Sequence, residues 1–244
     1  EQTGMTTLPR HHLQPTLDFL LALQKHNNKA WFDAHREAYQ VAKQRFEEFV
    51  DTFIDEFRAI EDFENLSATD CVFRIYRDVR FSKDKQPYKP NMGASIALGG
   101  KHSLRAPYYI HIEPPNQSFL AGGIYMPTPD QLAAIRRAID RDSSRLKAAI
   151  SSKPFKKHFG SLSGEKLKTP PRGYPADHPE IELLKYKQFI TMHHLSDKEV
   201  LSPRLLKHTV EVFVGAQPPP EKIITSVDFA RNLTALAEYV ARLR

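Results

Sequence analysis

The densest group of ionisable side chains in this 244-residue chain lies between Arg74 and Lys89. The segment holds six basic and two acidic residues, so it carries +4 of the chain's net charge of +6. So much positive charge in one place destabilises a fold by self-repulsion unless an anionic group offsets it. Arginine side chains grip phosphate and carboxylate groups through paired N–H donors. The segment therefore predicts a binding site for a small anionic ligand.

Alternation along the segment indicates which of its side chains act together. Its composition predicts a strand or an extended segment over residues 71–81, and in a continuous strand over 72–81 a period of two places Arg74, Asp78 and Arg80 on one face. Arg77 lies on the opposite, apolar face, where a guanidinium must be paired or must open into a cavity. We expect these three arginines to hold the anion. Asp78 is expected to orient them or to act as an acid or base.

Five further side chains are assigned to the same site from their positions in the sequence. Lys85 and Tyr88 follow in the adjoining loop and are expected to close the site or to donate a proton, and Lys89 to bind the ligand. Glu113 is expected to reach across the sheet and pair with an arginine of the segment, because buried arginines need carboxylates. Tyr125 follows two glycines and is expected to line the same pocket.

The segment also resembles a known family signature. It fits the pattern Arg-x-x-Arg-Asp-x-Arg-Phe-x-x-x-Lys-x-x-Tyr of a bacterial and fungal family called domain of unknown function 2461, and every specified position is filled (Arg74, Arg77, Asp78, Arg80, Phe81, Lys85 and Tyr88, with Pro87 as the usual companion). Similarity extends over about residues 15–240. The resemblance implies a shared site, and it implies no particular reaction.

A second row of polar residues, Tyr109, His111 and Glu113, alternates along another strand candidate. Histidine and glutamate at alternate positions could begin a metal site, but no third ligand follows at a suitable spacing, and we predict no metal. The phosphate-binding glycine loops and the dinucleotide fingerprint are absent, so no cofactor is assigned.

Composition excludes several classes of protein. The chain is 41% hydrophobic and 26% charged, which is typical of a globular protein and unlike a disordered one. No apolar run approaches the ~18 residues that a membrane-spanning helix needs, so no membrane partner is expected. The single cysteine, Cys71, cannot form an intramolecular disulfide, and a cytoplasmic location is expected.

Hydrophobic periodicity predicts helices on both sides of a run of strands. An aromatic stripe recurs at helical spacing over residues 29–60 and predicts core packing (Phe32, Tyr39, Phe46, Phe49, Phe53 and Phe57). Further strands are expected over 92–98, 107–113, 117–126 and 186–195, and further helices over 17–23, 128–150, 202–215 and 227–243. This order predicts an α+β fold with a mainly antiparallel sheet flanked by helices. We expect a single domain over 16–244 after a flexible segment over 1–15.

Two other functions remain open at this point. A nucleic-acid-binding module would use the same basic charge, with Tyr76, Phe81 and Tyr88 stacking on bases. Acidic residues spread through the 29–62 helix argue against a broad basic face. A non-catalytic scaffold would use the arginines and aspartates as an internal ion-pair network that binds nothing. Neither the oligomeric state nor the presence of an enzymatic activity follows from the sequence.

Overall fold

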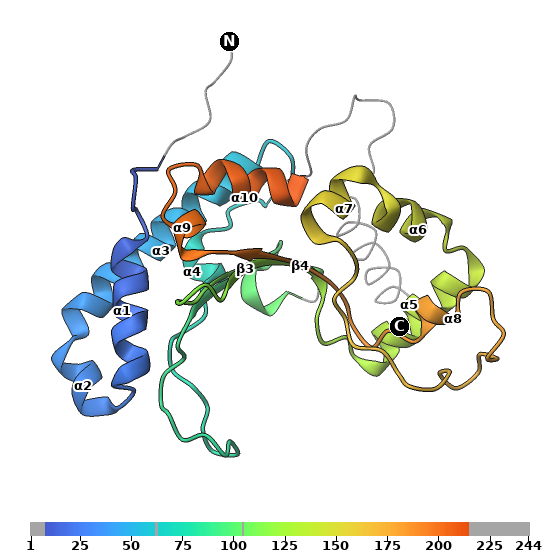
Figure 1. The fold of residues 1–244 in the computed structure, drawn as a ribbon, viewed down its shortest axis with the longest axis horizontal. Coiled ribbons are helices and arrows are strands. Elements are labelled where there is room, and N and C mark those ends of the chain that lie inside the picture. Colours follow the sequence, from blue (N-terminus) through green and yellow to red (C-terminus); the bar gives the residue numbers. More distant parts are fainter. Residues whose placement is uncertain (1–7, 62, 104, 215–244) are drawn as a thin grey trace, which may run out of the picture. The chain divides into compact units, whose positions relative to one another are not determined.

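A computed structural model describes residues 8–61, 63–103 and 105–214, and it contains a four-stranded antiparallel sheet (Figure 1). The order of the strands in the sheet follows the chain: β1 (Met92–Ile96), β2 (Tyr108–Ile112), β3 (Ser118–Ile124) and β4 (Phe189–Leu195). This confirms the α+β class and the antiparallel sheet. In the described part of the chain, no helix is both long and apolar enough to cross a membrane.

Two compact units divide the chain. Among the described residues, the first unit covers 8–102, 109–120 and 194–210 without residue 62, and the second covers 103–108, 121–193 and 211–214 without residue 104. One domain over 16–244, following a flexible segment over 1–15, stays a prediction, because both ends of the chain lie outside the described residues. The helix expected over 227–243 lies outside them as well.

Four helices begin the first unit: α1 (Gln14–Lys25), α2 (Lys29–Ala34), α3 (Arg36–Phe57) and α4 (Ala68–Cys71). Asn28 caps α2 by accepting a hydrogen bond from the Trp31 N–H at 3.0 Å. Four phenylalanines of the aromatic stripe lie on α3 and are fully buried, which confirms their place in the core (Phe46, Phe49, Phe53 and Phe57), whereas Tyr39 on the same helix is only partly buried. The helix expected over 29–60 is interrupted at His35, whose backbone leaves the helical region.

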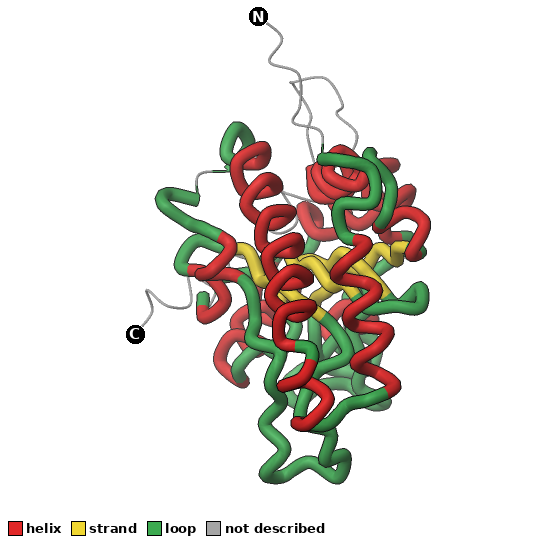
Figure 2. Tube along the Cα trace, turned by 90° about the vertical axis from the view of Figure 1, so that its left-hand side faces the viewer, coloured by secondary structure: helices red, strands yellow, loops and turns green. Residues whose placement is uncertain are grey.

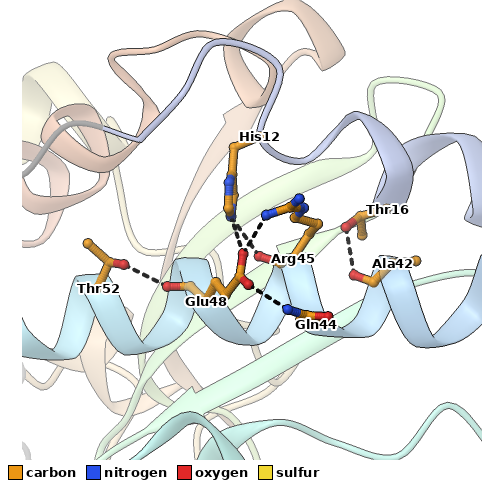
Figure 3. A network of polar contacts seen from close by, with 7 residues as sticks. All are labelled: His12, Thr16, Ala42, Gln44, Arg45, Glu48 and Thr52. Atoms are coloured by element: carbon orange, nitrogen blue, oxygen red, sulfur yellow. Dashed lines mark hydrogen bonds and ion pairs between the residues drawn. The ribbon is translucent and has the colours of Figure 1, made fainter.

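A small set of polar contacts fixes the start of α1 on α3 (Figure 3). The His12 imidazole lies 3.0 Å from the carbonyl oxygen of Arg45 and 3.6 Å from the carboxylate of Glu48. One turn further on, the Thr16 hydroxyl donates to the carbonyl of Ala42 at 2.9 Å. Because Thr16 is buried, this hydrogen bond replaces those that its hydroxyl would otherwise make to water.

Helices α5 (Pro129–Arg141), α6 (Ser144–Ser151), α7 (Lys153–Phe159) and α8 (Ile181–Leu184) belong to the second unit. A capping box forms at the start of α5, with the side chains of Thr128 and Gln131 each accepting a hydrogen bond from the backbone N–H of the other residue. The helix expected over 128–150 breaks at residues 142–143. Its apolar face joins a core that includes Ile135, Ile139 and Phe155.

Three short elements complete the described chain: a 3-10 turn over Gly100–His102, and the helices α9 (Asp197–Val200) and α10 (Leu205–Val214). Ser196 and Glu199 form a capping box at the start of α9. Helix α10 corresponds to the helix expected over 202–215, and it starts three residues later.

Residues 71–81 form no regular strand, which was one of the two forms expected for them. Helix α4 ends at Cys71, and the chain then forms a long loop of two facing legs over residues 72–91 (Figures 1 and 2). One isolated antiparallel bridge, Val72 with Ala94, joins the first leg to β1, and another, Tyr76 with Tyr88, joins the two legs. Pro87 and Pro90 explain the difference, because a proline has no N–H to donate to a continuous ladder. The name "motif loop" is used below for residues 72–91.

Candidate functional site

The motif loop is held in place by a side chain that acts as a neighbouring strand would. Asn27, in the turn before α2, accepts a hydrogen bond from the Tyr88 N–H at 3.1 Å and donates to the Tyr88 carbonyl at 3.0 Å. Two backbone hydrogen bonds join the legs, from Arg77 N to Pro87 O at 2.9 Å and from Lys89 N to Ile75 O at 2.8 Å. The loop therefore has defined geometry without a regular sheet.

Tyr88 lies in an aromatic cluster between the motif loop and α2. Its ring is only 3% exposed and stacks on Phe32, with centroids 4.0 Å apart and an interplanar angle of 11°. Tyr76 packs against the same two rings and stays 45% exposed. Burial raises the pKa of the Tyr88 phenol. These contacts give Tyr88 a packing role, and its predicted role in closing a site or donating a proton stays a prediction.

Exposure along the first leg alternates as predicted, although no strand forms. Arg74, Tyr76, Asp78 and Arg80 are exposed, whereas Arg77 is partly buried. Asp84 pairs with Arg77, and Asp78 accepts two hydrogen bonds from the Arg80 guanidinium at 3.0 and 2.6 Å. Hydrogen bonding to these arginines lowers the pKa of both carboxyl groups, so Asp78 is a weak base.

Two lysines of the motif loop donate hydrogen bonds to backbone oxygens. Lys85 donates to the Val79 carbonyl at 3.0 Å, and Lys89 donates to the Arg74 carbonyl at 2.9 Å. Burial, and secondarily the charge of Arg74, lowers the pKa of Lys89. Arg74 is exposed, and within the described residues its guanidinium has no carboxylate partner. Within the described residues, four cations of the motif loop have no paired carboxylate (Arg74, Lys83, Lys85 and Lys89), and two of these, Lys89 and Arg74, are joined by the hydrogen bond from the Lys89 ammonium to the Arg74 carbonyl.

Tyr109 and His111 on β2, together with Glu113 directly after its last residue, form a row of three hydrogen-bonded side chains, called the relay below. The Tyr109 hydroxyl lies 3.2 Å from His111 Nδ1, and His111 Nε2 lies 2.7 Å from a Glu113 carboxylate oxygen. An ionised carboxylate only accepts, so Nε2 carries the proton and Nδ1 accepts from the phenol. Glu113 therefore fixes the imidazole tautomer that can take a proton from Tyr109.

The expected pairing of Glu113 with an arginine is wrong. Strand alternation places His111 two residues away on the same face, and Glu113 pairs with it instead. Arg77 and Arg80 each find a carboxylate within the motif loop itself. Local pairing within a loop costs less chain ordering than a contact across the sheet.

Apolar and aromatic neighbours surround the relay. The Phe119 ring, on β3, stacks on the His111 ring with centroids 4.4 Å apart. His111 is 9% exposed, and this burial lowers its pKa although Glu113 acts in the opposite direction. The imidazole is therefore neutral at neutral pH and able to accept a proton.

Phe73 connects the relay with the positive charge of the motif loop. Its ring centroid lies 6.4 Å from that of Tyr109, and the Lys89 ammonium lies 5.5 Å from the Phe73 centroid. Gly93, on β1, is the residue against which the phenol packs, since a Cβ there would lie only 2.5 Å from the Tyr109 oxygen. Phe73 therefore links the relay to Lys89, and these residues all lie in the first unit.

Sequence analysis singled out the relay residues but missed three that position the site: Asn27, Phe73 and Gly93. A glycine inside a strand often marks a close approach by another group, so Gly93 carried a readable signal. Asn27 carried none, because its bonds to Tyr88 span 61 residues. Tyr125, in the second unit, is 62% exposed, and its predicted part in the site stays a prediction. No cluster of metal-ligating side chains occurs among the residues with described positions.

Comparison with known proteins gives a family and no more. A family model described as conserved hypothetical protein (DUF2461) matches residues 15–219, which include both the motif loop and the relay. No curated protein and no solved structure matches the chain.

Proposed function

Because the chain belongs to the DUF2461 family of conserved hypothetical proteins, whose description names no reaction, we propose a function from the site itself. The protein binds a small ligand that carries a phosphate or carboxylate group, and it transfers a proton to or from that ligand. Arg74 and Lys89 bind the anionic group, and the relay of Tyr109, His111 and Glu113 transfers the proton.

The observation that carries this proposal is the imidazole of His111, held on one side by Glu113 at 2.7 Å and on the other by the Tyr109 hydroxyl at 3.2 Å. A carboxylate that orients a histidine, which in turn accepts from a hydroxyl, is the arrangement that enzymes use to activate a hydroxyl group. A histidine that only packed in the core would not need both a carboxylate and a phenol hydrogen-bonded to its two ring nitrogens.

Charge in the motif loop supports the choice of an anionic ligand. Asp78 and Asp84 neutralise Arg80 and Arg77, respectively, so these two arginines resemble the structural network considered above. Within the described residues Arg74 has no such partner, and the Lys89 ammonium donates to a carbonyl oxygen. A phosphate or carboxylate would supply the missing negative charge.

Thermal unfolding at low salt tests the binding step, with inorganic phosphate and malonate as probes. A ligand at a hundred times its dissociation constant stabilises a protein by about 2.7 kcal/mol, which raises the melting temperature by a few degrees. We expect this shift in the parent protein and its loss in Arg74→Gln and Lys89→Gln. Lys83→Gln is the matched control, because Lys83 is an exposed cation of the same loop. An equal loss in all three variants, or no shift in the parent, contradicts the proposal.

Nitrogen NMR of the imidazole tests the proton-transfer step. We expect the His111 Nε2 signal to be that of a protonated nitrogen and the Nδ1 signal that of an acceptor, with a change at Nδ1 in Tyr109→Phe. A proton on Nδ1 in the parent protein would mean that the phenol cannot donate to it, and the relay would fail as an acid–base group.

Nucleic-acid binding is a second candidate, favoured by one observation. Phe81 is 96% exposed in the motif loop, with the Arg80 guanidinium 5.9 Å from its ring centroid. Exposed aromatic rings beside cations stack on unpaired bases. Binding of a single-stranded oligonucleotide that weakens with salt and is lost in Phe81→Leu would support it, whereas unchanged binding in Phe81→Leu would exclude stacking at this residue.

A further inference from the structure

We propose that Tyr109 is a nucleophile that accepts a phosphoryl group from a phosphate ester. This inference rests on the proposed function for the class of ligand, and it goes further by assigning a covalent step to one oxygen atom. In this step His111 acts as the general base, and Glu113 orients His111.

The spacing of the three side chains supports this assignment. Tyr109 and His111 occupy alternate positions of β2 and Glu113 follows its last residue, so the backbone sets their spacing, and the ring of Phe119 stacks on the imidazole. A hydroxyl, an imidazole and a carboxylate in line form the general pattern of an activated nucleophile. A phenol has a pKa of about 10, far below that of an aliphatic alcohol, so the imidazole removes its proton more easily.

The step balances without a cofactor or an oxidant. The Tyr109 oxygen forms a bond to phosphorus while the bond from phosphorus to the ester oxygen breaks. The phenolic proton passes to His111 Nδ1 and then to the departing alkoxide, which leaves as an alcohol. The same imidazole then takes a proton from water, whose oxygen attacks phosphorus. The bond from phosphorus to the Tyr109 oxygen breaks, phosphate is released, and the imidazole gives its proton to the Tyr109 oxygen.

Charge favours phosphorus over an acyl carbon as the electrophile. A phosphoryl group carries negative oxygens that remain charged throughout the transfer, and cations are the usual means of holding them. Arg74 and Lys89 supply such cations, and Phe73 contacts both Lys89 and Tyr109. A carboxylic ester carries no charge that would need these groups.

A fluorophosphonate probe tests the nucleophile directly, because it reacts by forming a P–O bond and breaking a P–F bond. Peptide mass spectrometry then reports the labelling rate at each tyrosine. Tyr125 is an internal control, since it is 62% exposed and has no histidine beside it within the described structure. We expect Tyr109 to react faster than Tyr125 by on the order of tenfold or more, as general-base assistance predicts.

Three variants make the result specific. Tyr109→Phe is expected to abolish labelling at this position, and His111→Gln and Glu113→Gln are expected to slow it toward the rate of Tyr125, with folding checked by circular dichroism. If His111→Gln fails to fold, Glu113→Gln gives the same comparison without removing the ring. Equal rates at Tyr109 and Tyr125, or a Tyr109 rate unchanged in a folded His111 or Glu113 variant, would overturn the proposal.

The two proposals fail separately. The probe is uncharged, so Arg74→Gln is expected to lose the phosphate-induced thermal shift and still to be labelled. If Tyr109 is labelled in a parent protein whose melting temperature does not respond to phosphate, the nucleophile is supported and the anionic ligand is contradicted. A phosphate shift without labelling would leave the binding site and reject the covalent step.

Discussion

Gly93→Ala separates the position of the Tyr109 phenol from the stability of the fold. Gly93 lies in β1 and does not have a positive φ, so alanine causes no backbone strain there. Its Cβ would lie 2.5 Å from the Tyr109 oxygen and 3.1 Å from the ring carbon that bears it. The atoms that must give way are the far end of a side chain, so the phenol moves and β1 does not.

The size of the effect follows from these distances. The phenol must retreat by about 0.9 Å to restore an ordinary 3.4 Å contact. A retreat of that size away from His111 would lengthen the present 3.2 Å hydrogen bond beyond its useful range. Loss of one such bond costs ~0.5–1.5 kcal/mol, and replacing glycine by alanine returns ~0.4–1 kcal/mol through the unfolded chain. The net change in stability is therefore expected to be below ~1 kcal/mol.

Two measurements on the same sample check this reasoning. Denaturant unfolding should give a free energy close to that of the parent, while fluorophosphonate labelling of Tyr109 should fall toward the rate of His111→Gln. Gly122→Ala is the matched control, because a Cβ at that strand position meets nothing closer than 3.8 Å. Parent-like labelling in Gly93→Ala would refute the link between phenol position and reactivity. A loss of more than ~3 kcal/mol would show that the phenol cannot retreat.

Three further outcomes are expected. Tyr88→Phe keeps the stack on Phe32 and should change stability little, whereas Tyr88→Ala should cost ~3–5 kcal/mol in denaturant unfolding; loss of phosphate binding in Tyr88→Phe would instead favour a role for its hydroxyl in the site. Burial lowers the pKa of His111 below its ordinary 6.5, so protonation favours the unfolded chain. The stability that this group contributes is present above pH 6.5 and is lost as pH falls through the lowered folded value, and His111→Gln should show a smaller decrease over that window. Burial raises the pKa of Cys71 to about 12, so its thiol should react with Ellman's reagent at pH 8 only after unfolding. Rapid reaction of the native protein would contradict that burial.

Prediction from the sequence succeeded where the relevant geometry is local. Tyr109, His111 and Glu113 share a face because side chains alternate along any strand, and the alternation of exposure over residues 74–80 appears even without a ladder. The strand predicted for the motif loop failed because pairing depends on the facing leg, where Pro87 and Pro90 cannot donate. The partner expected for Glu113 was wrong because the sequence does not show which of two possible partners, His111 or a distant arginine, lies nearer in the fold.

The sequence by itself determined the α+β class, the buried aromatic face of α3 and the capped starts of α5 and α9, because periodicity and capping act over three or four neighbouring residues. Only the tertiary structure decided that Asn27 holds Tyr88, that Phe32 buries its ring, and that Gly93 leaves room for the Tyr109 hydroxyl. These contacts join segments 16 to 61 residues apart. Their formation depends on how whole elements pack, which no short stretch of residues encodes.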